Sequence, residues 1–275
     1  PGCFHIPAPC TYRNPFNETD PAQLAQLCLQ ALEDEIAFQG AATIAAFIME
    51  PVLGAGGVIP PHPSFMPGVE KLCRKHGILL IADEVITAFG RTGAWTGSRL
   101  WGVKPDFSCC AKAITNAYFP FGAVMIAEQV AEVFETDDTG KAAIGHGYTY
   151  SGHPVGAAAA LVTLAETQRL KVNENAAARG AELHAGLLKL KEKHSAIGDV
   201  RGGHGLMHAV ELVSDRATKS APDKATPGKV QKAAYEAGAM IRVSGPNIIL
   251  SPPLILTPAD VQEIVKAVDA GLSAL

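Results

Sequence analysis

The chain has 275 residues, of which 48% are hydrophobic and 18% are charged. This composition can bury a sizeable core and excludes a disordered chain. The formal net charge is −4 and no long basic run occurs, which argues against nucleic-acid binding. No apolar run is long enough to cross a bilayer, so we expect no membrane partner.

The first half of the sequence alternates helices with short apolar strands. A helix is expected to start where Asp20 can cap the chain and Pro21 can occupy the first turn. The expected helices are 21–38 and 64–76, and the expected strands are 45–50, 78–82, 106–111 and 123–127. Near-continuous apolar strands between helices predict a parallel sheet that is covered on both faces.

The composition changes after Pro154, where alanine and leucine become frequent. Helices are expected at 155–169 and 173–194, strands at 205–212, 240–243 and 248–251, and a last helix from the cap at Thr257. This pattern is typical of a smaller α+β domain. We therefore predict two domains, a large one over residues 1–150 and a small C-terminal one over 151–275.

The six cysteines form no CxxC pair and no spacing of a zinc site. This arrangement of cysteines favours a protein whose thiols stay reduced, and we expect a cytoplasmic location. His146 and His153 lie seven residues apart without a nearby carboxylate pair, so we predict no metal site.

Three charged residues fall at predicted strand ends, which is where α/β sheets bind ligands. Lys112 interrupts the apolar run 107–114, Asp83 closes the run 77–83, and Glu50 follows a third strand. An uncompensated charge buried there would cost several kcal/mol, so each needs a partner. A desolvated lysine can form a Schiff base with an aldehyde, and an aspartate can keep a pyridine nitrogen protonated. Pyridoxal phosphate (PLP) requires both a lysine for the Schiff base and an acid beside its ring nitrogen.

Five segments resemble the class III aminotransferases, and more narrowly their ω-amino acid or amine:pyruvate branch. They are IMEPVLGAGG (48–57), IADEVITAFGRTG (81–93), AKAITNAYFPFGA (111–123), HGYTYSGHP (146–154) and ILSPPL (249–254). The resemblance implies a three-layer αβα PLP-transferase fold of type I, with a mostly parallel sheet and a smaller C-terminal α+β domain. It also implies a homodimer with active sites at the subunit interface.

The resemblance implies a role for individual residues. Lys112 matches the Schiff-base lysine and Asp83 the partner of the pyridine nitrogen. Val85 matches a side chain packed on the cofactor ring. Thr149 matches a threonine that reaches the neighbouring subunit's cofactor phosphate. Arg242 matches an arginine that binds the substrate carboxylate.

Glu50 sits where the family keeps an active-site glutamate, and we assign it to the cofactor site. Two departures from the family pattern stand out. Relatives that use glutamate carry a second glutamate at the position of Ala55, so its absence favours pyruvate or an aldehyde as acceptor. The N-terminal part of the family fold, with its phosphate-binding Gly-Ser turn and ring-stacking aromatic residue, does not occur in this sequence.

Each assignment has a plainer alternative. Lys112 could be a solvated surface group, Asp83 could cap the following turn, and Glu50 could bind backbone amides. Val85 could be core, Thr149 a turn residue, and Arg242 part of a surface ion pair.

The hypothesis is a PLP-dependent transaminase that moves an amino group from a primary amine or ω-amino acid to a keto acid. An aminomutase or a decarboxylating transaminase on the same fold is an alternative. An inactive fragment or one subunit of a split aminotransferase is another. We also expect weak PLP retention, with slow loss of the cofactor on dialysis.

Overall fold

The computed structural model describes residues 2–275 and divides them into two compact units. The first unit contains the residues up to Pro51, Pro61–Phe89 and Thr96–Leu170. The second contains Val52–Pro60, Gly90–Trp95 and Lys171–Leu275. The predicted division at residue 150 into the family's large and small domains stays a prediction.

The first unit is built on a four-stranded sheet in the order β1-β2-β3-β4. Its strands are β1 (Ala46–Met49), β2 (Leu79–Asp83), β3 (Phe107–Cys110) and β4 (Ala123–Ile126). The first three are parallel, and β4 pairs antiparallel with β3. Parallel strands therefore end together at one edge of the sheet, as the sequence pattern predicts.

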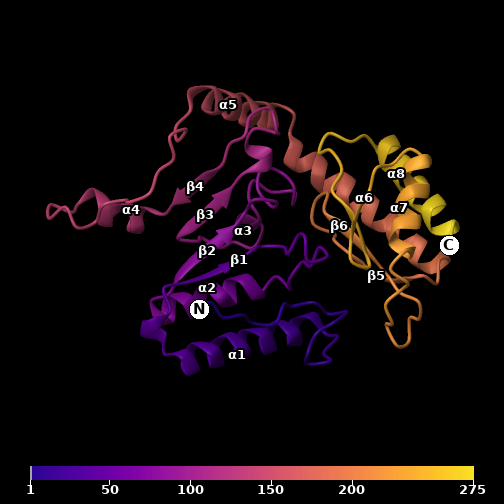
Figure 1. Ribbon diagram of the computed structural model, residues 1–275, viewed down its shortest axis with the longest axis horizontal. Coiled ribbons are helices and arrows are strands. Elements are labelled where there is room, and N and C mark those ends of the chain that lie inside the picture. The colour runs from indigo at the N-terminus through magenta and orange to yellow at the C-terminus, as the bar shows by residue number, and fades with distance from the viewer. Residues whose placement is uncertain (1) are drawn as a thin grey trace. The chain divides into compact units, whose positions relative to one another are not determined.

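Two helices, α1 (Pro21–Gln39) and α2 (Phe65–His76), lie on one side of this sheet (Figure 1). Helix α2 packs against the strands, and α1 packs against α2. The side chain of Asp20 accepts a hydrogen bond from the backbone N–H of Gln23 at 2.8 Å, which confirms the predicted cap. The two helices approach closely at Gly68, where a Cβ would lie 2.4 Å from a methyl group of Leu29.

The two faces of the sheet are not buried equally. Leu80 and Ala82 are fully buried, whereas Ile48 and Leu79 are 61% and 37% exposed. The expectation that both faces are covered is thus met on only one face by the described residues. The remaining elements of this unit are α3 (Gly97–Leu100), α4 (Glu128–Glu135), α5 (Pro154–Arg169) and the short 3₁₀ turns Ala41–Thr43 and Lys112–Ile114.

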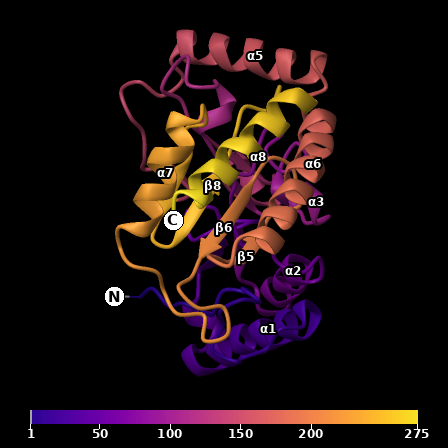
Figure 2. The same ribbon diagram turned by 90° about the vertical axis from the view of Figure 1, so that its right-hand side faces the viewer.

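The second unit is a four-stranded antiparallel sheet with three helices on one face. Its strands, in the order β5-β6-β8-β7, are β5 (Ile197–Arg201), β6 (His208–Leu212), β8 (Asn247–Leu250) and β7 (Arg242–Ser244). Its helices are α6 (Val172–Lys193), α7 (Thr226–Glu236) and α8 (Pro258–Ser273). Figure 2 shows these helices beside one another over the strands. Their apolar faces, including Leu183, Val230 and Val268, form one core with Leu212 and Ile248.

The architecture confirms the predicted fold class, although several elements differ from prediction. The strand expected at 205–212 begins only at His208, because Gly205 has a φ of +59° that a strand does not allow. The sequence reading missed β5 and α7. Among the described residues, no helix combines the length and the apolar character that crossing a membrane requires.

Candidate active site

The candidate site lies at the edge where the three parallel strands end. Glu50 directly follows β1, Asp83 is the last residue of β2, and Lys112 comes two residues after β3. Asp83 is in register with Cys109, and only two residues separate Cys109 from the lysine. The structure therefore brings Asp83 and Lys112 to neighbouring strand ends, with Glu50 on the next strand along.

Asp83 is half-buried and organises the turn that follows it. Its Oδ1 accepts a hydrogen bond from the backbone N–H of Val85 at 3.0 Å. This bond is the one expected of the plainer capping alternative. It occupies one carboxylate oxygen, and Oδ2 can accept a further donor. Val85 is half-buried next to it, in the same turn.

Glu84 is a residue that the sequence reading did not single out. It is fully buried, yet its carboxylate is well satisfied. The backbone N–H groups of Gly97 and Ser98 donate to it at 2.8 and 2.7 Å, and the hydroxyls of Thr87 and Ser98 donate as well. Its position directly after the apolar run, beside Asp83, is the only signal of this role in the sequence.

Lys112 differs from expectation in its burial. The sequence predicts a desolvated amine at a buried strand end, but the side chain is exposed. Lys112 lies beyond the end of β3, as the first residue of a 3₁₀ turn, and so is not one of the side chains of the sheet. Its φ of +45° is left-handed, which costs a residue other than glycine about 1–2 kcal/mol. Strain of this kind persists at functional sites because the surrounding structure imposes it.

The surroundings of Lys112 fix this conformation. Ile114 and Thr115 are 6% and 1% exposed. The backbone N–H of Thr115 donates to the carbonyl of Lys112 at 3.4 Å, and the Thr115 hydroxyl donates to the carbonyl of Phe119 at 2.6 Å. The lysine thus stands on a well-anchored loop although its side chain is open to solvent.

Negative charge reaches the same strand ends. Burial raises the pKa of the Cys110 thiol to about 11, and the charges of Glu84 and Asp83 add to this effect. Burial also raises the pKa of Cys109, with Asp83 contributing. In both thiols burial is the largest cause of the raised pKa, and the neighbouring carboxylates add to it.

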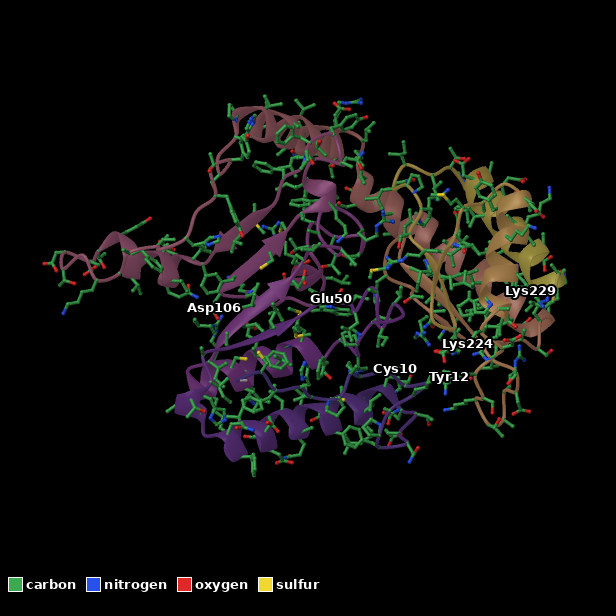
Figure 3. The ribbon with its side chains drawn as sticks, in the orientation of Figure 1. Cys10, Tyr12, Glu50, Asp106, Lys224 and Lys229 are labelled. Atoms are coloured by element: carbon green, nitrogen blue, oxygen red, sulfur yellow. The ribbon has the colours of Figure 1, made fainter. Side chains whose placement is uncertain are left out.

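The opposite edge of the sheet carries a buried carboxylate with a structural role. Figure 3 shows Asp106 at that edge, away from Glu50. Burial alone would raise the pKa of Asp106, but hydrogen bonds from the Leu80 N–H, Arg74 and Gln129 hold the pKa below its ordinary value. Both bonds from Arg74 Nη1 are short, at 2.6 and 2.7 Å. Asp106 therefore anchors α2 to the sheet.

Thr149 lies in an exposed turn of the long segment between α4 and α5. The turn is closed by a hydrogen bond from the Ser151 N–H to the Tyr148 carbonyl at 2.9 Å. This accords with the plainer turn alternative and leaves the phosphate role a prediction. The nearby His153 caps α5, since its Nδ1 accepts from the Val155 N–H at 3.2 Å. Among residues 2–275, no group of three His, Cys, Asp or Glu side chains is placed to hold a metal ion.

Arg242 belongs to the second unit, where it is the exposed first residue of β7. Ala55 is also in this unit, at the exposed tip of the loop Val52–Pro60. The Ser244 hydroxyl, at the end of β7, donates to the Ala55 carbonyl at 3.2 Å. The position predicted to select the acceptor is thus tied to the strand that carries Arg242.

The residues of the first unit fit PLP in their chemistry. Asp83 offers a carboxylate oxygen for a protonated ring nitrogen, and Lys112 offers an amine for an aldehyde. The two stand on adjacent strand ends at one edge of the sheet. The strained backbone of Lys112 is a second, independent sign of a site.

Comparison with known proteins gives a consistent result. The family model for "Aminotransferase class-III" matches residues 1–272. A probable gamma-aminobutyrate transaminase 3 from Oryza sativa subsp. indica is 37% identical, over 100% of this chain and 54% of the relative. A putrescine–pyruvate aminotransferase from Pseudomonas aeruginosa is 35% identical, over 96% of this chain and 57% of the relative. The chain thus spans about half the length of the curated relatives it matches.

Solved structures agree with these relatives. An amine transaminase from an uncultivated Pseudomonas species, in its PLP-bound (internal aldimine) form, superposes with a TM-score of 0.95 at 46% identity. That match covers 98% of this chain and 61% of the other. An (S)-enantioselective omega-transaminase from Thermomicrobium roseum gives a TM-score of 0.93 at 40% identity, over 99% and 60% of the two chains.

Proposed function

Because this chain belongs to the class-III aminotransferases, we propose that it transfers an amino group from a primary amine or ω-amino acid to a keto acid, with PLP as its cofactor. The observation that carries the proposal is the placement of Asp83 and Lys112 on adjacent parallel strand ends. The similar putrescine–pyruvate aminotransferase and amine transaminase support the substrate class.

The cofactor and the residues of the chain have different roles in the proposed reaction. When bound, PLP supplies an electron sink for the electrons that remain when a proton leaves the substrate carbon. Lys112 Nζ would hold the cofactor through its aldehyde and would serve as the general base and acid that moves the substrate proton. Asp83 would accept a hydrogen bond from the ring nitrogen and would keep that nitrogen protonated.

The other site residues position the reactants. Val85 would pack on the ring, and Glu50 would stand at the edge of the cofactor site. Thr149 would reach the cofactor phosphate of a second copy, which makes a homodimer part of the proposal. Arg242 would bind the acceptor carboxylate, because a planar guanidinium suits bidentate recognition.

The acceptor is proposed to be pyruvate or an aldehyde. Ala55 offers no carboxylate that could pair with Arg242. We also place the protein in a reducing compartment, the cytoplasm. All six cysteines are unpaired, which supports this placement.

Lysine mapping tests the proposed function directly. The chain is incubated with PLP, reduced with borohydride and digested, and the labelled peptide is identified by mass spectrometry. We expect the label on Lys112 and its loss in Lys112→Ala. Lys104→Ala is the matched control, since this exposed lysine lies just before the same strand. A label on another lysine, or no label in the wild type, would contradict the proposal.

One observation favours a second candidate, the subunit of a split aminotransferase. Three consecutive apolar side chains of the edge strand β4, Val124, Met125 and Ile126, are 57%, 46% and 42% exposed. Such an edge is suited to cover by another polypeptide. If amine-dependent bleaching of the bound cofactor's visible absorption appears only after a second polypeptide is added, this candidate replaces the first.

A further inference from the structure

The loop Val52–Pro60, which we call the acceptor loop, is a small hairpin in the second unit. The N–H of Leu53 donates to the Ile59 carbonyl at 3.2 Å, and the N–H of Ile59 donates back to Leu53 at 2.8 Å. Val58 is only 1% exposed, whereas Ala55 at the tip is exposed. The loop therefore has a fixed base, and the Gly57 and Val58 N–H groups close its turn by donating to the Gly54 carbonyl at 3.1 and 3.0 Å.

A buried arginine binds the turn of the loop. Arg201, the last residue of β5, is 8% exposed. Its Nε donates to the Gly57 carbonyl at 2.8 Å and its Nη2 to the side-chain oxygen of Asn247. Its Nη1 donates to Glu211 at 2.7 Å and to Asp199 at 3.1 Å. The two carboxylates stabilise the buried charge, and the rest of the guanidinium is directed at the loop and at β8.

The contact at Gly57 leaves no room for a side chain. A Cβ on Gly57 would lie 2.9 Å from Nη2 of Arg201 and 3.3 Å from Nδ2 of Asn247. The φ of Gly57 is also +120°, a conformation that favours glycine. The guanidinium of Arg201 therefore packs directly against the backbone of the loop at Gly57.

The same network continues to the strand that carries Arg242. The side-chain amide of Asn247 donates to the Ser244 carbonyl at 3.3 Å. The hydroxyl of Ser244 in turn donates to the carbonyl of Ala55 at 3.2 Å. A continuous chain of hydrogen bonds therefore runs from Arg201 through β7 to the tip of the acceptor loop.

We infer that Arg201 is a positioning residue that sets recognition of the acceptor carboxylate by fixing the acceptor loop against β7. The inference rests on the proposed function, in which Arg242 binds that carboxylate beside Ala55. Arg201 itself does not touch the substrate. Loosening the loop should therefore weaken acceptor binding and leave the reaction with the amine donor, which depends on Lys112, unchanged.

The test uses the substitution Arg201→Lys in the full chain. Lysine keeps a positive charge for Glu211, so the unit stays folded, but a single ammonium cannot reproduce the fork that reaches Gly57 and Asn247. Ser244→Ala is a milder second variant, since it removes only the bond to Ala55. Arg216→Lys is the matched control, because Arg216 also donates to backbone carbonyls, of Ile197 and His194, and these carbonyls lie outside the acceptor loop.

Hydrogen exchange of the peptide spanning 52–60 is the first readout, and it requires no activity. We expect about tenfold faster exchange in Arg201→Lys, the factor for a lost charge-assisted hydrogen bond. A smaller change is expected in Ser244→Ala and none in Arg216→Lys. Exchange that stays at the wild-type rate in Arg201→Lys, or rises equally in the control, would overturn the inference.

Acceptor recognition is the second readout. We expect the KM for pyruvate to rise about tenfold in Arg201→Lys, while the rate at which an amine donor converts the bound cofactor without acceptor stays the same. Protection of the loop by saturating pyruvate should fall in parallel. A loss in the donor reaction with an unchanged KM would overturn the inference. If the wild type is inactive, the proposed function is wrong. Hydrogen exchange of the acceptor loop, with and without pyruvate, in wild type and Arg201→Lys would still decide the role of Arg201.

Discussion

Asp83 and Glu84 are consecutive carboxylates with opposite surroundings. Asp83 is half-buried and uses one oxygen in the turn to Val85. Glu84 is fully buried, and its two oxygens accept from the turn at Gly97 and Ser98. Because both oxygens of Glu84 are hydrogen-bonded, its side chain holds the backbone of the adjacent Asp83 in place. We therefore interpret Glu84 as the anchor of the strand end that presents Asp83.

Glu84→Gln tests this interpretation. An amide cannot accept on both sides, so a donor near its nitrogen loses its partner, and we expect the free energy of unfolding to fall by about 1–3 kcal/mol. Urea denaturation of the variant gives this value. Glu70→Gln is the control, since this partly exposed carboxylate accepts from the Lys104 N–H at 3.1 Å. Equal losses in the two variants would show that burial of Glu84 does not matter.

Helix α8 shows how local sequence and packing combine in one element. Its first turn is a capping box, in which the Asp260 N–H donates to Thr257 and the Thr257 N–H donates to Asp260. Pro258 occupies the first helical position, where its missing N–H costs nothing. Val261, Val268 and Leu272 then lie on the buried face. The cap fixes where the helix starts, and so which side chains enter the core.

Thr257→Ala should lower the free energy of unfolding by about 1 kcal/mol, because the N–H of Asp260 loses its acceptor. Thermal or urea unfolding measures the change. Lys266→Ala on the same helix is the control, since its side chain is 78% exposed and its ammonium lies 3.7 Å from the Glu263 carboxylate. If the control loses as much stability as Thr257→Ala, the capping bond is not the cause.

At the scale of the whole molecule, a histidine cluster makes stability depend on pH. His208 on β6 is fully buried, and neither ring nitrogen has a hydrogen-bond partner of normal geometry among the described residues. Its ring lies 5.5 Å from that of His184 on α6. Burial lowers the pKa of His208 to about 3, and the charges of His184 and His204 act in the same direction, although a backbone contact at Gly180 opposes them.

The sign of the pH effect follows from this lowered pKa. Between pH 6.5 and about 3 the unfolded chain binds a proton that the folded His208 does not. Stability is therefore full above pH 6.5, and His208 alone removes about 1.4 kcal/mol per pH unit below it.

Urea unfolding at several pH values compares the wild type with His208→Leu, in which nothing titrates at this position. We expect the pH slope to be shallower in the variant by about 1.4 kcal/mol per pH unit. His62→Leu is the control, because this histidine lies in the first unit and its Nδ1 is hydrogen-bonded to Ser64. Identical slopes in wild type and His208→Leu would contradict the prediction.

The sequence by itself determined the parts that depend on nearby residues. Asp20 and Pro21 predicted the start of α1 because a cap and a first turn are local. Apolar runs predicted β1 and β2, and hence the strand ends at Glu50 and Asp83, because periodicity is set by consecutive side chains.

Only the tertiary structure decided the features whose partners are distant in the chain. Glu84 is satisfied by backbone groups 13 and 14 residues away, and Arg201 reaches Gly57 across 144 residues. The exposure of Lys112 was likewise decided by its place in the turn beyond β3, and the apolar run around it gave the opposite expectation. The physical reason is that burial and hydrogen-bond pairing belong to the folded surroundings, whereas sequence patterns describe only neighbours along the chain.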